Sequence, residues 1–149
     1  PHQATGDQRR GDAPPAPGVA EAFEDLVAAC GAEPVHYPLR LTCCSGALII
    51  TNREAALSLV RNLLESAARA KAAVIVTACP LYQVNLECYQ KQVNKEFGTE
   101  LNVPVMYFTQ LIGLALGIPP KRLGIGSELV AVLPAIADAR EPEPVLAGK

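Results

Sequence analysis

The segment Ala72-Ala73-Val74-Ile75-Val76-Thr77-Ala78-Cys79-Pro80 sets the architecture of this chain. From Ala72 to Ala78 it is continuously apolar or β-branched, a pattern typical of a short central strand in a parallel sheet that is covered on both faces. Pro80 suits the first position of a helix, because that position needs no backbone N–H donor. The segment therefore predicts a strand over Ala72–Ala78, Cys79 at or beside a helix N-cap, and a helix that runs to about Phe97.

The sequence on either side continues this alternation of helices and strands, because apolar residues recur there at helical spacing or in short runs. The further predicted elements are a helix over Val19–Cys30 that ends at Gly31, a short strand over Pro34–Tyr37, a helix capped by Thr51 or Asn52, a strand over Val103–Tyr107 and a helix over Phe108–Leu116. This order predicts an α/β layered fold with a small, mostly parallel sheet flanked by helices. In such sheets, sites form at the carboxyl ends of the strands.

Proline and glycine divide the chain into three parts. Residues 1–18 interleave glycines with prolines, so we expect a flexible linker or loop there. Residues 19–134 are predicted to fold as one domain, which is long enough to bury a core. Residues 135–149 place Pro142 and Pro144 among charged residues, and we expect a loose C-terminal tail.

Charge and composition exclude several classes of partner. Among the 149 residues, 13 basic and 15 acidic side chains give a net charge of −2, which offers no electrostatic argument for nucleic acid or for an anionic membrane. No apolar run reaches the roughly 18 residues needed to span a bilayer. The five cysteines are odd in number and no secretion signal is visible, so we expect reduced thiols in a cytoplasmic protein rather than a disulfide framework.

Cys43 and Cys44 are adjacent, and Cys79 directly follows the predicted central strand. Neighbouring cysteines are poor disulfide partners for each other, and both can face one centre only if the backbone turns, which Ser45-Gly46 can supply. A helix N-terminus favours the thiolate form of Cys79. The three cysteines therefore suggest a soft-metal or iron–sulfur site, with simple packing as the alternative for each.

The other two cysteines are better explained by packing. Cys30 continues the apolar stripe of the first predicted helix, and Cys88 lies at helical spacing from Leu81 and Val84. A free cysteine in such a position behaves as a small hydrophobic residue. We therefore leave Cys30 and Cys88 out of the predicted site.

Four stretches carry a resemblance to a known family, and together they span about Phe23 to Gly124. They are Leu26–Glu33 leading to Tyr37-Pro38-Leu39, then Cys43–Leu48, then Cys79–Leu86, and Val103-Pro104-Val105 through Tyr107–Gly117. These stretches resemble the cysteine-rich CCG domain found in the family of heterodisulfide reductase B subunits, and most closely the second, C-terminal CCG domain of a two-domain member.

The resemblance implies thiol or disulfide redox chemistry within a larger oxidoreductase complex. Members of that family hold iron–sulfur clusters that deliver electrons to a substrate disulfide or a sulfur carrier, and a partner flavin and iron–sulfur subunit supplies the electrons. For this chain the resemblance implies an electron-transfer or disulfide-reducing role. The cofactor would be a cluster of the 4Fe–4S type with Cys43, Cys44 and Cys79 as its metal ligands.

The chain also departs from the family pattern. Tyr82 stands where the last cysteine of a Cys-Pro-x-Cys motif is expected, Ser45 replaces a glycine, and no cysteine precedes the first helix, so three of the five expected sulfur ligands remain. Three thiolates suit a 4Fe–4S cluster with an open iron or a mononuclear metal with another ligand. The alternatives are a degenerate, cluster-free docking domain, and a metal-free site in which Cys79 attacks a disulfide and Cys43 or Cys44 resolves it.

Overall fold

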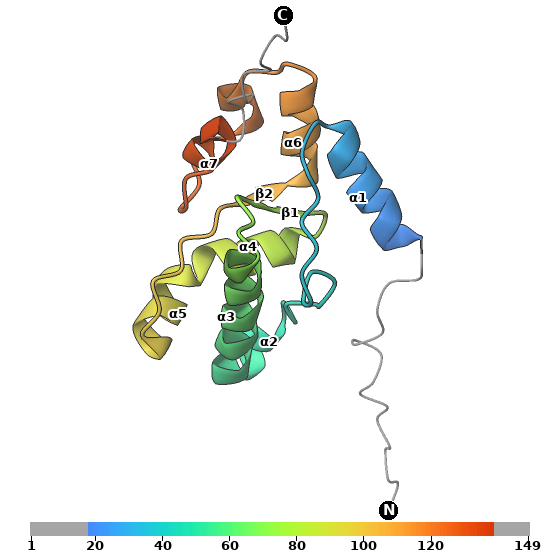
Figure 1. Cartoon of the computed structure of the whole chain (residues 1–149). Helices are drawn as coiled ribbons and strands as arrows, with labels where there is room; N and C mark the ends of the chain where they lie inside the picture. The colour runs from blue at the N-terminus through green and yellow to red at the C-terminus, as the bar shows by residue number, and fades with distance from the viewer. Residues whose placement is uncertain (1–17, 139–149) are drawn as a thin grey trace, which may run out of the picture.

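The computed structural model of the chain describes residues 18–138 (Figure 1). Residues 1–17 and 139–149, where most of the expected linker and tail fall, lie outside the described residues. The elements follow in the order α1 (Val19–Ala29), α2 (Leu48–Thr51), α3 (Arg53–Arg69), β1 (Ile75–Thr77), α4 (Pro80–Cys88), α5 (Gln90–Phe97), β2 (Val105–Tyr107), α6 (Phe108–Ala115), the 3-10 helix η1 (Pro120–Leu123) and α7 (Leu133–Asp138).

A two-stranded parallel sheet of β1 and β2 lies at the centre, with helices on both sides (Figure 1). The register pairs Ile75 with Val105, Val76 with Met106 and Thr77 with Tyr107. The predicted α/β fold with a small parallel sheet flanked by helices is therefore confirmed.

The sheet separates two hydrophobic cores because successive strand residues point to opposite faces. Ile75 and Val105 belong to the first core, which also contains buried residues of α3, α4 and α5. Val76 and Met106 belong to the second core, which also contains residues of α6. In Figure 1, α3, α4 and α5 accordingly lie on one side of the strands, and α1, α6 and α7 lie on the other. Both faces of the central strands are covered, as the sequence predicted.

Helix α3 is the longest helix among the described residues and begins where a cap was expected. The Asn52 side chain accepts a hydrogen bond from the Ala55 N–H at 3.1 Å, which satisfies one of the free donors of the first turn. Its buried face consists of Ala56, Leu57, Val60, Leu63, Leu64 and Ala67. Leu57 is fully buried on this face, whereas Leu59 is only half-buried.

The single helix predicted after Cys79 is in fact two helices, α4 and α5, that meet at Tyr89. Gln90 gives the physical reason for the break. Its side chain is 2% exposed, donates from Nε2 to the Val103 carbonyl at 2.7 Å and accepts from the Val103 N–H at 2.9 Å. A change of direction at Tyr89 brings this amide to the backbone that leads into β2.

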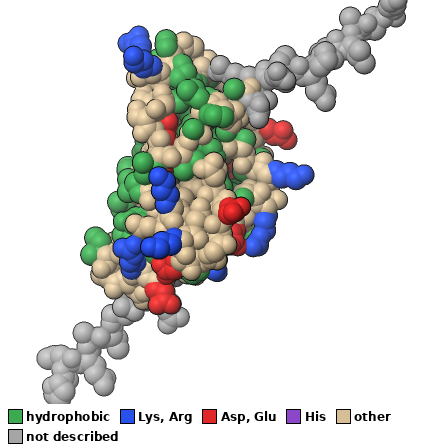
Figure 2. All heavy atoms as spheres, turned by 90° about the vertical axis from the view of Figure 1, so that its left-hand side faces the viewer, with side chains coloured by type: hydrophobic (Ala, Val, Ile, Leu, Met, Phe, Trp, Pro, Cys, Tyr) green, Lys and Arg blue, Asp and Glu red, His purple; other side chains and the backbone are tan. Residues whose placement is uncertain are grey.

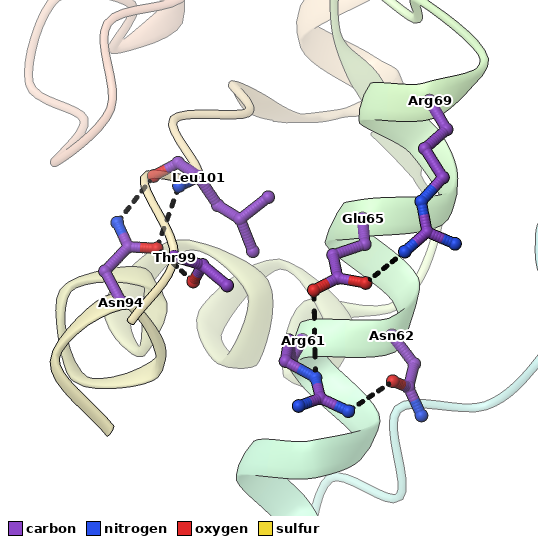
Figure 3. A network of polar contacts seen from close by, with 7 residues as sticks. All are labelled: Arg61, Asn62, Glu65, Arg69, Asn94, Thr99 and Leu101. Carbon is purple, nitrogen blue, oxygen red and sulfur yellow. Dashed lines mark hydrogen bonds and ion pairs between the residues drawn. The ribbon is translucent and has the colours of Figure 1, made fainter. Parts of the chain in front are cut away.

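The same connection is held at its other end by Asn94 (Figure 3). The Asn94 side chain donates to the Leu101 carbonyl and accepts from the Leu101 N–H, both at 2.8 Å, and it also accepts from the Thr99 hydroxyl. Across from it on α3, Glu65 lies between Arg61 and Arg69 (Figure 3). Side-chain amides thus replace the missing ladder bonds of the irregular segment before β2.

Three other predictions need correction. No strand forms over Pro34–Tyr37, where Pro34 and Pro38 lack the N–H that a ladder requires. The two strands are also shorter than the predicted runs Ala72–Ala78 and Val103–Tyr107. Finally, α7 crosses the boundary expected after Pro134, so the first residues of the expected tail are helical.

The surface carries no dominant charge on the face drawn in Figure 2. Lysine, arginine and acidic side chains are interspersed there with apolar ones over the described part of the chain. Between residues 18 and 138, no helix combines the length and the apolarity needed to cross a bilayer.

Candidate functional site at the carboxyl end of the sheet

Cys79 lies where β1 passes into α4, as the sequence predicted. It is the N-cap residue of α4, with extended backbone at φ −104° and Pro80 at the first helical position. The Cys79 N–H donates to the Thr77 hydroxyl at 3.1 Å, and the Tyr107 hydroxyl donates to the Ala78 carbonyl at 2.7 Å. The ends of both strands are thereby joined beside an exposed Cys79 thiol.

The Cys43–Gly46 loop lies against the first turn of the same helix. A Cβ atom on Gly46 would come within 2.9 Å of the Leu81 Cβ, so the backbone of the loop approaches α4 more closely than another residue would allow. The predicted turn is present. It is Ser45, at φ 52°, that adopts the left-handed conformation, and the Ser45 N–H donates to the Cys43 sulfur at 3.3 Å.

Cys44 is the buried member of the pair, at 1% exposure, whereas Cys43 is exposed. The Cys44 thiol donates weakly to the Leu81 carbonyl at 3.9 Å, and its sulfur accepts from Asn85 Nδ2 at 3.8 Å. Burial raises the pKa of the Cys44 thiol to about 11, and the nearby charges of Cys43 and Cys79 act in the same direction. Without a metal, Cys44 is therefore a neutral thiol at pH 7.

The sequence analysis missed two residues that build this site, Leu81 and Asn85. Both lie on α4 after Cys79. They are four residues apart, which places them on neighbouring turns along one side of the helix. Asn85 is 2% exposed, and its position inside an otherwise apolar helix face is the signal that could have identified it.

The donor set suits a soft metal in kind, because iron–sulfur clusters and zinc take cysteine sulfur. The structure brings the loop of Cys43 and Cys44 to the helix that Cys79 caps, close enough for charges on Cys43 and Cys79 to act on Cys44. Within residues 18–138, however, no three His, Cys, Asp or Glu side chains form a group ready to hold a metal ion. The three thiols are thus of the kind that such a metal group binds, but they do not lie together as a complete metal site in this structure.

The three cysteines fall within a segment that is shared with a known family. The family model of the cysteine-rich domain named CCG matches residues 6–87, which is more than half of the chain and includes Cys43, Cys44 and Cys79. The chain belongs to the CCG cysteine-rich domain family. The match begins inside the segment that we expected to be a linker.

Curated relatives of this CCG domain are subunits of redox complexes. The chain is 37% identical over 109 residues, 73% of its length, to the 8-methylmenaquinol:fumarate reductase membrane anchor subunit of Wolinella succinogenes, and covers 38% of that protein. It is 34% identical over 121 residues, 80% of its length, to the B subunit of the ferredoxin:CoB-CoM heterodisulfide reductase of Methanosarcina mazei, and covers 40% of that protein. The chain thus spans about two-fifths of these relatives, and the resemblance to heterodisulfide reductase B subunits is confirmed.

Tyr82 stands where the last of the five expected cysteine ligands was predicted. It is half-buried and packs against the first core, as does Tyr37. Burial is the main reason why the pKa of Tyr82 is raised, and the charges of Tyr37 and Cys44 act in the same direction. In this chain the position therefore carries a neutral, packed phenol.

The two remaining cysteines of the chain, Cys30 and Cys88, behave differently from each other. Cys30 is half-buried and packs against the second core, as predicted. Cys88 is exposed, together with Leu81 and Val84 on the same helix, so the predicted packing role of Cys88 is wrong. Asn85 and Leu86 are the residues of α4 that point inward. Helical spacing groups residues on one face of a helix, but it does not tell which face is covered.

An open hollow adjoins the cysteine loop on the side of α2. It has a volume of about 450 Å³ and is lined by Ser45, Gly46, Ala47, Leu48 and Thr51. The loop that carries Cys43 and Cys44 is thus approachable from solvent on this side.

Proposed function

We propose that this CCG domain is an electron-transfer part of a redox complex, with Cys43, Cys44 and Cys79 as the ligands of an iron–sulfur cluster. The observation that carries the proposal is the close approach of Gly46 to Leu81. It joins two segments that lie far apart in the sequence, and it places the cysteine pair beside the helix that Cys79 caps. Three thiols from two segments are a donor set that such a cluster accepts.

Each thiol has its own part in the proposed site. Cys43 and Cys79 are exposed and accessible to an incoming metal, whereas Cys44 is buried and fixed in place by α4. A bound cluster would supply one-electron transfer, and three cysteine ligands would leave one iron of a 4Fe–4S cluster without a sulfur from this chain. The chain's own task is to hold the thiols at one end of the sheet, and binding of the metal would displace their protons.

The roles of the relatives support the presence of partner subunits. One relative is a subunit of a heterodisulfide reductase and another is a subunit of a fumarate reductase. We therefore infer that this domain receives electrons from a flavin and iron–sulfur subunit and passes them to a disulfide or a sulfur carrier. Its free cysteines suit a reducing compartment, and a cytoplasmic location belongs to the proposal.

The test is anaerobic reconstitution of the chain with iron and sulfide, followed by iron and sulfide analysis and an absorption spectrum. We expect a coloured protein in which Cys79→Ser greatly lowers iron content. Cys88→Ser is the matched control, because Cys88 is also exposed and lies at the other end of the same helix. A wild-type chain that stays colourless and free of iron would refute the proposal.

A second candidate function is a cluster-free docking domain of the same complex. The observation that favours it is Tyr82, which fills a ligand position of the family with a ring packed against the core. Under this alternative the reconstituted chain stays colourless, and each Cys→Ser variant behaves as the wild type in metal analysis.

A further inference from the structure

Asn85 is a buried polar side chain that faces the cysteine loop. It lies on α4 at 2% exposure, among residues of the first core. Its Nδ2 group donates to the Cys44 sulfur at 3.8 Å and to the Gly46 carbonyl at 3.4 Å. Burying an amide is costly unless its hydrogen bonds are made, so the two contacts explain why this group is tolerated inside the domain.

The two bonds of the amide act on the same loop. One holds the backbone at Gly46, where the loop already touches Leu81, and the other holds the sulfur two residues earlier. A single side chain therefore fixes both the loop and the ligand atom that the loop presents.

The two contacts of the Cys44 sulfur differ in what they require of it. The contact with the Leu81 carbonyl needs the thiol proton, whereas the contact with Asn85 needs only a lone pair on sulfur. A sulfur that ligates a metal carries no proton but can still accept a hydrogen bond. Asn85 is thus the donor to the Cys44 sulfur that is compatible with metal binding.

We propose that Asn85 is a positioning residue that holds the Cys44 loop on α4 and raises the reduction potential of the group that Cys44 helps to bind. This inference rests on the proposed function. Hydrogen bonds to the ligand sulfurs are among the factors that set the potential of iron–sulfur sites. The N–H of Asn85 stabilises negative charge on sulfur, and the reduced site is the more negative one.

The first experiment measures the midpoint potential of the reconstituted chain by an optical redox titration. Asn85→Leu removes both donors at similar volume, and Asn85→Ala serves if the leucine variant does not fold. We expect the ratio of reduced to oxidised sites at a fixed potential to fall about tenfold, which is about 59 mV downward for one electron. Gln90→Leu, which removes an equally buried amide bonded to Val103, should leave the midpoint unchanged. An unchanged midpoint in the Asn85 variants would overturn the effect on potential.

The second experiment needs no metal, so it separates this inference from the proposed function. Amide hydrogen exchange of the metal-free, reduced chain should be about tenfold faster for the peptide that holds residues 43–47 in Asn85→Leu than in the wild type, relative to the peptide that holds Cys30. The rates are compared at a temperature where circular dichroism shows both proteins folded. If the wild type takes up no iron, the proposed function fails, and hydrogen exchange alone decides: faster exchange of residues 43–47 supports the positioning role and equal exchange overturns it.

Discussion

The loop that leads into β2 and the loop that carries Cys43 and Cys44 are both held by buried amides, but the bonds differ in length and in partner. Gln90 forms two short bonds, at 2.7 and 2.9 Å, with the backbone of Val103. Asn85 forms two longer contacts, at 3.4 Å to a carbonyl and at 3.8 Å to a sulfur. The first pairing fixes the fold, whereas the second holds a loop whose outer thiols remain accessible. The contrast separates residues that stabilise the domain from residues that would serve the proposed site.

The largest expected effect comes from removing the two short hydrogen bonds between Gln90 and Val103. Gln90→Leu leaves the buried N–H and carbonyl of Val103 without their partner. Since each such group costs about 1–3 kcal/mol, we expect the free energy of unfolding to fall by about 2–5 kcal/mol. Urea denaturation of the metal-free chain measures this loss. Glu96→Gln, exposed on the same helix, should stay within about 0.5 kcal/mol of the wild type. A loss in Gln90→Leu as small as that of the control would contradict the account.

The next effect concerns the buried thiol and depends on pH. The folded state raises the pKa of Cys44 from 9.0 to about 11, chiefly by burial, so folding favours the protonated thiol. Its contribution is complete below pH 9 and is lost as the pH rises from 9 to 11. We expect the difference in free energy of unfolding between the wild type and Cys44→Ala to shrink by about 2–3 kcal/mol over that interval. The alanine variant retains every other titrating group. A difference that stays constant from pH 8 to 11 would show that Cys44 is not buried as described.

A smaller effect is expected at the strand end beside Cys79. Tyr107→Phe removes the hydroxyl that donates to the Ala78 carbonyl at 2.7 Å and keeps the ring against Phe108. The loss of one hydrogen bond at a partly exposed site should lower the free energy of unfolding by about 1 kcal/mol. Thermal or urea denaturation measures it. No change would mean that the two strand ends are held together by the sheet alone.

The smallest effect belongs to the half-buried ion pair of Arg61 and Glu65 on α3 (Figure 3). Arg61 pairs with Glu65 at 3.9 Å, and its guanidinium lies 4.5 Å from the centre of the Phe97 ring. Arg61→Gln should cost about 0.5–1 kcal/mol, because an ion pair at 3.9 Å that solvent still reaches contributes little. The ionic part should disappear in about 1 M salt, where screening acts within roughly 3 Å. A loss above about 2 kcal/mol would place this network with Gln90 among the main stabilising contacts.

Most of the helices and strands could be predicted from the sequence, because their positions depend on local patterns. The β-branched run before Cys79, the proline after it and Asn52 before α3 each act through their own backbone, so strand, N-cap and helix start were all found. The break at Tyr89 was not predictable, because its cause is a bond from Gln90 to Val103, which lies 13 residues further along the chain.

The candidate site was predicted only in part for the same reason. The cysteines could be named from their spacing, but Asn85 acts across 41 residues on Cys44, and no local pattern indicates such a contact. Cys88 was misjudged because helical spacing identifies a stripe without saying whether anything covers it. The structure supplies the long-range contacts that decide both cases.

The central claim is that Cys43, Cys44 and Cys79 act as one site, and alkylation mapping of all five cysteines tests it most directly. The chain is labelled before and after anaerobic loading with iron and sulfide, and mass spectrometry reads each cysteine. The account predicts that Cys43 and Cys79, both exposed without metal, become protected together, while the buried Cys44 stays unlabelled throughout and Cys88 stays reactive. Protection of Cys88 with continued labelling of Cys79 would contradict it.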